Sequence, residues 1–367
     1  MTRPHVAVEG AAAAPWPPAG RRHSLDVLRI LAICGVVAIH TFGHTVTNES
    51  LVGSTQWLLA VALDYGFVWT VPVFVMISGA LTLAPRAHRD GPAAFYRKRA
   101  SRILPALVVW NIVYLLLIRV LLRGEPPSLG GLVQMVIDGQ VYTQLYFLWL
   151  ILGLYLVAPV LAAFLNSGTE KRIRIFAAVA LAWTLLVFMT PGIAELLGDP
   201  RPISLGALTM WWPYVGYFAA GYALSRTRFS ARQAILAGAA AVVLAALTIW
   251  QYANQDALTV LQAITPVGYL STGVALLAIA VFIAVITGLD RVRFSDRTGR
   301  VIVALSDASF GVFLVHMVFM ALFEKFAPGV MAGTSVLALA GVYVVILVVS
   351  YAVSMTAARI PGVRAVF

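Results

Sequence analysis

Arg29 and His40 lie in the first long apolar stretch and are spaced so that they share one face of a helix. They are eleven residues apart, a separation that returns to nearly the same face about 16 Å further along the axis. A guanidinium can bind an anion, and an imidazole can exchange a proton at neutral pH. Placing an ionisable side chain in a bilayer costs about 2.5–3.5 kcal/mol on insertion scales, so each such residue is expected to have a structural or functional role. The alternatives are an Arg29 that snorkels to the surface and a His40 that only bonds a neighbouring helix. Asp26 is expected to pair with Arg29 or Arg22.

A second histidine, His316, stands about as far into a later apolar stretch as His40 stands in the first, which predicts a similar depth. Ser309, seven residues earlier, shares its helical face. Asp64, in the outer half of the second stretch, is a candidate carboxylate partner that would fix the tautomer of one imidazole. The other interpretation places Asp64 at the outer surface in water. The candidate catalytic residues are therefore His40, His316 and Asp64.

His40 and His44 have the four-residue spacing of some zinc sites on helices. No glutamate follows His40, and the chain has a single cysteine, Cys34. We therefore expect no metal site and no intrachain disulfide.

A short basic stretch precedes the third apolar segment and contains Arg97, Lys98, Arg99 and Arg102. Arg99 and Arg102 are three residues apart, so they share a helical face and together can grip a phosphate group. The alternatives are that these cations only set the orientation of the chain in the membrane, or that they contact anionic lipid headgroups.

The elements that must hold these residues are membrane-spanning helices. The chain is 61% hydrophobic and 11% charged, against about 25% charged residues in a soluble domain. This composition excludes a soluble globular enzyme, a disordered chain and a disulfide scaffold. The net charge of +11 lies in short clusters between apolar runs, so it indicates membrane orientation and no nucleic-acid partner. Crossing a bilayer takes about 20 apolar residues, and the backbone must be bonded within each segment, so we predict an all-α fold. Ten stretches qualify: 25–45, 57–83, 103–122, 145–165, 173–190, 206–225, 233–251, 268–288, 301–323 and 333–357.

Lysine and arginine gather in alternate connections, which predicts that both termini are cytoplasmic in a multi-pass protein of the plasma or inner membrane. We expect an Ala/Pro-rich disordered tail over 1–20, a membrane domain over 21–358 and a short cytoplasmic tail over 359–367. No internal repeat is evident, unlike many transporters.

Five motifs in order give the chain a family resemblance. They are LDVLRILA at 25–32 followed by His40, VFVMISG at 73–79, YRKRASRILP at 96–105, GLYLVAP at 153–159 and SFGVFLVH at 309–316. Together they resemble the membrane acyltransferase-3 family, whose members O-acylate surface glycans and related acceptors. One position departs from the family pattern, because Gln144 aligns where many members carry a histidine.

The resemblance implies transfer of an acyl group, most often acetyl, from cytoplasmic acyl-CoA to a hydroxyl of a glycan, glycolipid or other acceptor. Arg99 and Arg102, with Arg29, would hold the phosphates of acetyl-CoA. The pantetheine arm would then extend along the first helix to His40, which would act as general base or transient acyl carrier, assisted by His316.

Two other functions stay open. A proton-coupled transporter or flippase for a lipid-linked or small solute would use His40, Asp64 and His316 as a proton relay. A non-catalytic membrane partner in envelope synthesis would leave His40 inert.

Overall fold

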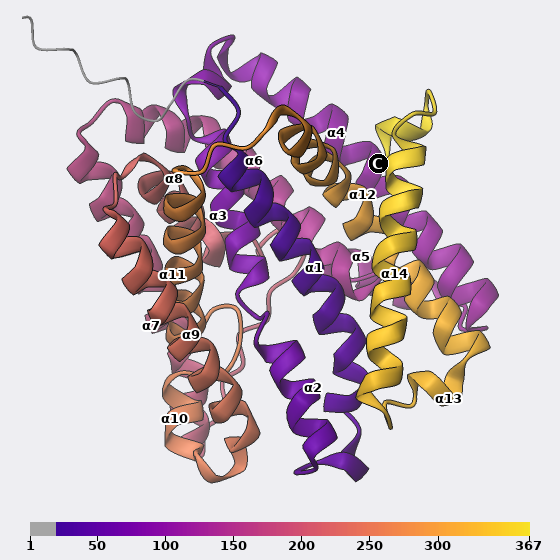
Figure 1. Cartoon of the computed structure of the whole chain (residues 1–367). Helices are drawn as coiled ribbons and strands as arrows, with labels where there is room; N and C mark the ends of the chain where they lie inside the picture. Colours follow the sequence, from indigo (N-terminus) through magenta and orange to yellow (C-terminus); the bar gives the residue numbers. More distant parts are fainter. Residues whose placement is uncertain (1–19) are drawn as a thin grey trace, which may run out of the picture.

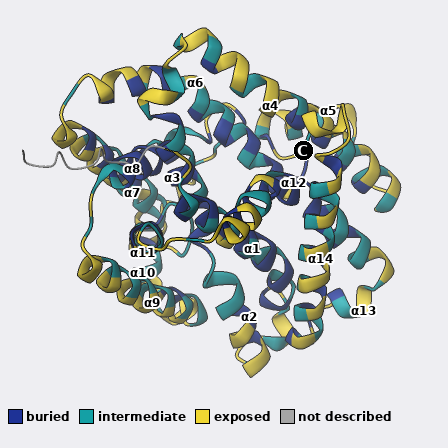
Figure 2. Ribbon diagram, turned by 45° about the horizontal axis from the view of Figure 1, so that its top comes forward, coloured by how far each residue is buried: buried dark blue, intermediate teal, exposed yellow. Residues whose placement is uncertain are grey.

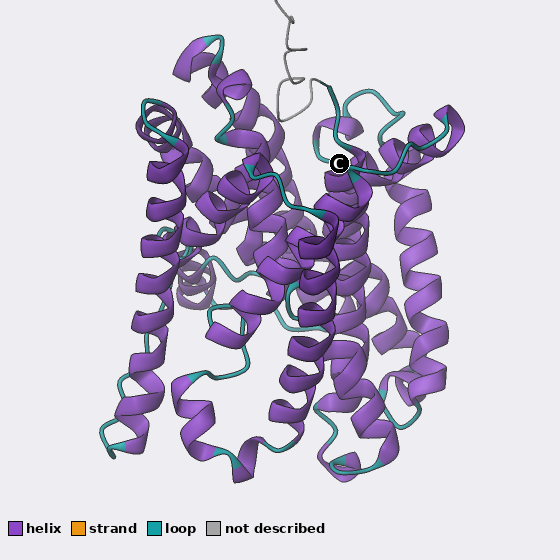
Figure 3. Cartoon of the chain, turned by 60° about the vertical axis from the view of Figure 1, so that its left-hand side comes forward, coloured by secondary structure: helices purple, strands orange, loops and turns teal. Residues whose placement is uncertain are grey.

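The computed structural model describes residues 20–367, which form helices and loops without a strand (Figure 3). The predicted all-α class is confirmed. Within the described residues, nine helical segments are long and apolar enough to cross a bilayer, and the chain is a multi-pass membrane protein. The tail predicted over 1–20 lies outside the described residues except for Gly20.

The helices fall into long and short groups. The long helices are α1 (His23–Val46), α4 (Gly91–Val113), α6 (Tyr146–Asn166), α7 (Glu170–Leu196), α9 (Ala231–Ala253), α11 (Thr272–Leu289), α12 (Asp296–Phe326) and α14 (Val336–Ala357). The shorter ones are α2 (Thr55–Tyr65), α3 (Thr70–Thr82), α5 (Leu129–Asp138), α8 (Val215–Arg226), α10 (Thr259–Ile264) and α13 (Pro328–Met331). Single-turn 3₁₀ segments are η1 (Glu49–Leu51), η2 (Pro85–His88), η4 (Thr143–Leu145), η5 (Trp212–Tyr214), η6 (Gln255–Ala257) and η7 (Val363–Ala365). A π-helical segment, η3 (Tyr114–Leu122), continues α4.

The second predicted segment, 57–83, is not one continuous helix but two, α2 and α3. Pro72 has no N–H to donate to the carbonyl of Val68, so a regular helix cannot run through this point. The break brings its residues against α1, where a Cβ added to Gly35 would lie 2.5 Å from Cγ2 of Thr70.

The sixth predicted segment, 206–225, forms a helix too short to count among the nine spans. It contains η5 and the 12-residue helix α8, most of which is buried. A Cβ on Gly79 of α3 would lie 1.8 Å from the carbonyl oxygen of Phe218, and one on Gly221 would lie 1.9 Å from that of Met76. The backbones of α3 and α8 therefore touch, as small residues allow in membrane bundles.

The third helix begins earlier than the sequence predicted. α4 starts at Gly91 rather than near residue 103, so the basic stretch lies within a helix instead of a loop. Arg99 and Arg102 are therefore held at fixed angular positions on α4.

Two packed clusters of side chains make up the interior. One is built mainly on α3, α6, α8 and α11, and the other mainly on α1, α4, α12 and α14. Figure 2 shows buried residues on inner helices such as α3 and α8 and exposed residues along α9. Phe74 and Phe147 contact both clusters, so the junction between the clusters is lined by aromatic rings.

The last residues fold back onto the bundle. The indole N–H of Trp110 in α4 donates to the carbonyl of Val366 at 2.8 Å, and the ring of Phe367 packs against Trp110 at 5.3 Å between centroids. The C-terminus lies toward the end of the bundle where α1 begins, at the top of Figure 1. We call this the basic end, because Arg86, Arg89 and Lys98 lie there beside the start of α1.

Candidate functional site

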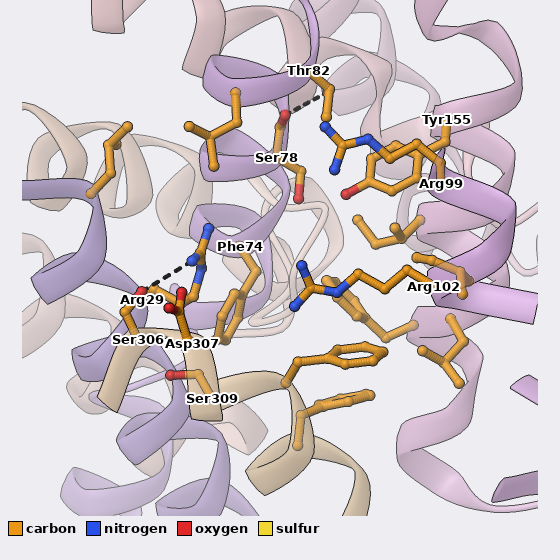
Figure 4. Close-up of a pocket in the computed structure, with 18 of the residues that line it drawn as sticks. Arg29, Phe74, Ser78, Thr82, Arg99, Arg102, Tyr155, Ser306, Asp307 and Ser309 are labelled. Carbon is orange, nitrogen blue, oxygen red and sulfur yellow. Dashed lines mark hydrogen bonds between the residues drawn. The ribbon is translucent and has the colours of Figure 1, made fainter. Parts of the chain in front are cut away.

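The stripe predicted along α1 faces a cavity. Arg29 and His40 both line it, and Arg29 lies nearer the basic end. The guanidinium of Arg29 donates to Oγ of Ser306 on α12 at 3.0 Å, as Figure 4 shows. Arg29 and His40 point to the same side of α1 because their spacing is close to a whole number of helical turns.

Asp26 anchors the basic end of this stripe. Its carboxylate accepts hydrogen bonds from Arg21 at 2.9 Å and from Ser306 at 2.7 Å, and Nη1 of Arg29 lies 3.9 Å away. The pairing with Arg29 was predicted, but Arg21 is the closer partner. The alternative partner named from the sequence, Arg22, forms an ion pair with Asp290.

Two carboxylates hold the Arg21 side chain at the cavity. It donates to Asp26 and, at 2.7 Å, to Asp307. These hydrogen bonds raise the pKa of Arg21 well above its ordinary value. Arg21 is therefore largely neutralised by its acidic partners, unlike the arginines of α4.

Arg99 and Arg102 line the cavity from α4 and lie against aromatic rings. The guanidinium carbon of Arg99 is 5.2 Å from the ring centroid of Tyr155, and that of Arg102 is 5.5 Å from the centroid of Phe310. Figure 4 shows both side chains reaching in from the same helix toward Arg29. Within the described chain, neither has an acidic partner. Arg97, in the same basic stretch, does not line the cavity.

The cavity joins the basic end to the interior of the bundle and has a volume of about 850 Å³. Cationic side chains surround its mouth, and aromatic and aliphatic side chains surround the rest. The cations are Arg21, Arg22, Arg29, Arg86, Arg89, Lys98, Arg99 and Arg102, whereas the acids are Asp26 and Asp307. From the sequence, Arg21, Arg86 and Arg89 were seen only as charge that sets the membrane orientation, because nothing local marks them as neighbours of a cavity.

His40 and His316 lie side by side, with ring centroids 5.4 Å apart and planes tilted by 38°. This agrees with the similar depth expected from their positions in α1 and α12. Nδ1 of His316 lies 2.8 Å from the carbonyl oxygen of Phe313 and 3.1 Å from that of Val312. Carbonyl oxygens only accept, so Nδ1 carries the hydrogen and Nε2 keeps its lone pair. Nε2 is enclosed and has no hydrogen-bonding partner within the described residues.

The predicted pairing of Asp64 with one of the histidines is not formed. Asp64 does not line the cavity, and a Cβ on Gly43, three residues beyond His40, would lie 3.6 Å from its Oδ2. The Asp64 carboxylate has no hydrogen bond or ion pair within the described chain. Asp64 approaches α1 near Gly43, almost one turn further from the basic end than His40, and residue spacing on separate helices could not reveal this offset.

His44 lies against α12, the helix that also carries His316. Its Nε2 lies 3.7 Å from Oε1 of Glu324, which also accepts a hydrogen bond from Arg123 at 2.7 Å. Over residues 20–367, no group of three side chains suited to holding a metal ion is found.

Further polar side chains that line the cavity are Gln144, Tyr146 and Ser309. Gln144 is 2% exposed, and neither its amide atoms nor the hydroxyl of Tyr146 has a hydrogen-bonding partner of good geometry in the described structure. The hydroxyl of Ser309 donates to the carbonyl of Leu305 at 3.0 Å. Sequence reasoning noted Gln144 only as a departure from a family pattern.

Comparison with known proteins gives one family. The model of the acyltransferase domain of the acyltransferase-3 family matches residues 22–357. No curated protein matches the chain, and no solved structure does. Because the match covers nearly the whole chain, the chain belongs to the acyltransferase-3 family and is an acyltransferase.

Proposed function

We propose that this protein transfers an acyl group, most simply acetyl, from cytoplasmic acyl-CoA to a hydroxyl of an extracytoplasmic or lipid-linked glycan. The observation that carries the proposal is the single cavity that joins an arginine-lined mouth to His40. Such a cavity suits a donor with an anionic head and a long, thin, uncharged arm.

The mouth would bind the nucleotide phosphates of the donor. Arg99 and Arg102 present guanidinium groups without acidic partners, and guanidinium groups bind phosphate through paired hydrogen bonds. Arg29, with its side chain held by Ser306 and Asp26, would contact the donor further in. The pantetheine arm would then run along α1 over the distance of about 16 Å that separates Arg29 from His40 by helical rise.

The imidazoles would accept and release the proton of the acceptor hydroxyl. In direct transfer, the acceptor hydroxyl gives its proton to His40 while its oxygen bonds to the thioester carbon. The C–S bond then breaks and the CoA thiolate takes the proton, which leaves an ester and free CoA. If His40 carries the acyl group instead, its nitrogen bonds to the thioester carbon, the C–S bond breaks and CoA leaves as its thiolate. The acceptor oxygen then bonds to the acyl carbon, the C–N bond to His40 breaks, and the thiolate takes the hydroxyl proton. His316, with Nε2 free to accept a hydrogen bond, would orient or assist His40.

Asp64 takes no part in this scheme, because it contacts neither imidazole. The same geometry weighs against the transporter alternative, which would use Asp64 together with the two histidines as a proton relay. The proposed orientation places the basic end in the cytoplasm, as the distribution of lysine and arginine predicts, with the protein in the plasma or inner membrane.

The test compares His40→Ala with His44→Ala. Both remove an imidazole from α1, but His44 lies outside the cavity. Cells that lack the gene, complemented with each variant, are analysed for ester-linked acyl groups in the envelope by mass spectrometry. We expect wild type and His44→Ala to restore the ester and His40→Ala to leave it absent, because general-base assistance is worth about 10²–10⁴-fold in rate. Full restoration by His40→Ala would refute the role of His40, and no gene-dependent ester at all would refute the proposed function.

A further inference from the structure

Gln144 is buried beside the proposed reaction centre. In the described structure its amide makes no hydrogen bond of good geometry, and its contact with the hydroxyl of Tyr114 falls short of that geometry. Gln144 belongs to η4, just before α6, is 2% exposed and lines the cavity. An enclosed amide without partners costs about 1–3 kcal/mol in proteins. A leucine or methionine of similar size would avoid this cost, so an amide here suggests a partner that binds in the cavity.

The helices place Gln144 at the depth of the two imidazoles. α6 runs toward the basic end and α12 runs away from it, and the rings of Phe147 and Phe313 meet between them at 5.5 Å. Gln144 stands three residues before Phe147, and His316 stands three residues after Phe313. Going from Phe147 to Gln144, and from Phe313 to His316, moves away from the basic end by about one helical turn, roughly 5 Å. The amide therefore lies level with His316, whose ring is beside that of His40.

Acyl transfer needs a hydrogen-bond donor at this depth. When an oxygen or nitrogen nucleophile adds to the thioester carbon, the carbonyl π electrons move to oxygen and form an oxyanion. They return when the C–S bond breaks and the thiolate leaves. Donors placed at the oxyanion are often the largest single contribution to catalysis of acyl transfer. The cations lie mainly at the mouth, and His40 is occupied with the nucleophile.

We infer that Gln144 donates its side-chain Nε2–H to the acyl carbonyl oxygen and stabilises the oxyanion of the tetrahedral intermediate. The inference rests on the proposed function and holds both for direct transfer and for an acyl-His40 intermediate. It makes Gln144 a catalytic residue whose free amide is retained at a cost in stability.

The experiment measures transfer of radiolabelled acetyl from acetyl-CoA into membranes of the producing cells, which supply their own acceptor. Gln144→Leu and Gln144→Met are compared with wild type. Both preserve approximate size but remove the amide donor. We expect kcat to fall about 10²–10³-fold in both, with KM for acetyl-CoA unchanged. The unfolding temperature of purified Gln144→Leu should equal or exceed that of wild type, because no enclosed amide remains unpaired.

The outcomes separate this inference from the function on which it rests. Wild-type membranes that transfer no label would refute the proposed function. Active wild type together with undiminished kcat in Gln144→Leu would overturn only the role of Gln144. A fall in kcat accompanied by a lower unfolding temperature and weaker acetyl-CoA binding would also overturn it, since that pattern is the mark of a structural residue.

Discussion

The double variant Arg99→Gln/Arg102→Gln tests how the donor is held. Both guanidinium groups line the cavity from α4, and neither has an acidic partner in the described chain. Glutamine keeps much of the side-chain length and can still hydrogen-bond, but it loses the charge. We expect donor affinity to fall while the protein remains folded, because the aromatic rings under the two guanidinium groups are retained.

The size of the effect follows from the exposure of the two arginines. A hydrogen bond to a charged group contributes about 1.5–3 kcal/mol when shielded from water. Arg102 is exposed and Arg99 is half-buried, so solvent screening reduces the contribution to about 1–2 kcal/mol each. The sum of about 2–4 kcal/mol corresponds to a rise in Kd of about 30- to 1,000-fold.

The assay is calorimetric titration of purified protein with CoA, repeated at two salt concentrations. Arg97→Gln is the matched control, because it removes the same charge from the same helix but outside the cavity. We expect Arg97→Gln to bind nearly as wild type does and the salt dependence to flatten only in the double variant. Equal weakening by Arg97→Gln and by the double variant would refute the reasoning, since a diffuse positive field would then suffice.

Two further predictions concern the histidine pair and the packing that holds the cavity walls. His316→Phe fills the ring volume but removes Nε2, so kcat should fall by up to about 10²-fold with CoA affinity unchanged in titration; unchanged turnover would contradict an assisting role. Gly79→Val places a Cβ where only 1.8 Å separates it from the Phe218 carbonyl, and overpacking of this kind costs about 1–3 kcal/mol or more. The detergent-solubilised variant should unfold at a lower temperature, whereas Gly341→Val, whose Cβ meets open space, should not; equal unfolding temperatures would show that α3 and α8 can separate freely.

The sequence by itself determined the membrane class, most of the spans and the stripe on α1. Bilayer thickness sets the length of each apolar run, and the helical repeat sets which residues of one helix share a face. Arg29 and His40 could therefore be placed on one face before any packing was known. The same local rules missed the break before α3, because the apolar run continues through Pro72. They missed the early start of α4, because its charged first turns belong to no apolar run.

Only the tertiary structure decided which helical faces meet. It brought His316 beside His40 and placed Asp64 near Gly43, almost one turn further along α1. It separated Arg99 and Arg102, which line the cavity, from Arg97, which does not. The physical reason is that a helix fixes the angle of each side chain about its own axis, whereas rotation and depth relative to other helices depend on close packing of the whole bundle. A polar group such as Gln144, enclosed and without a hydrogen bond of good geometry among the described residues, becomes visible only once its neighbours are in place.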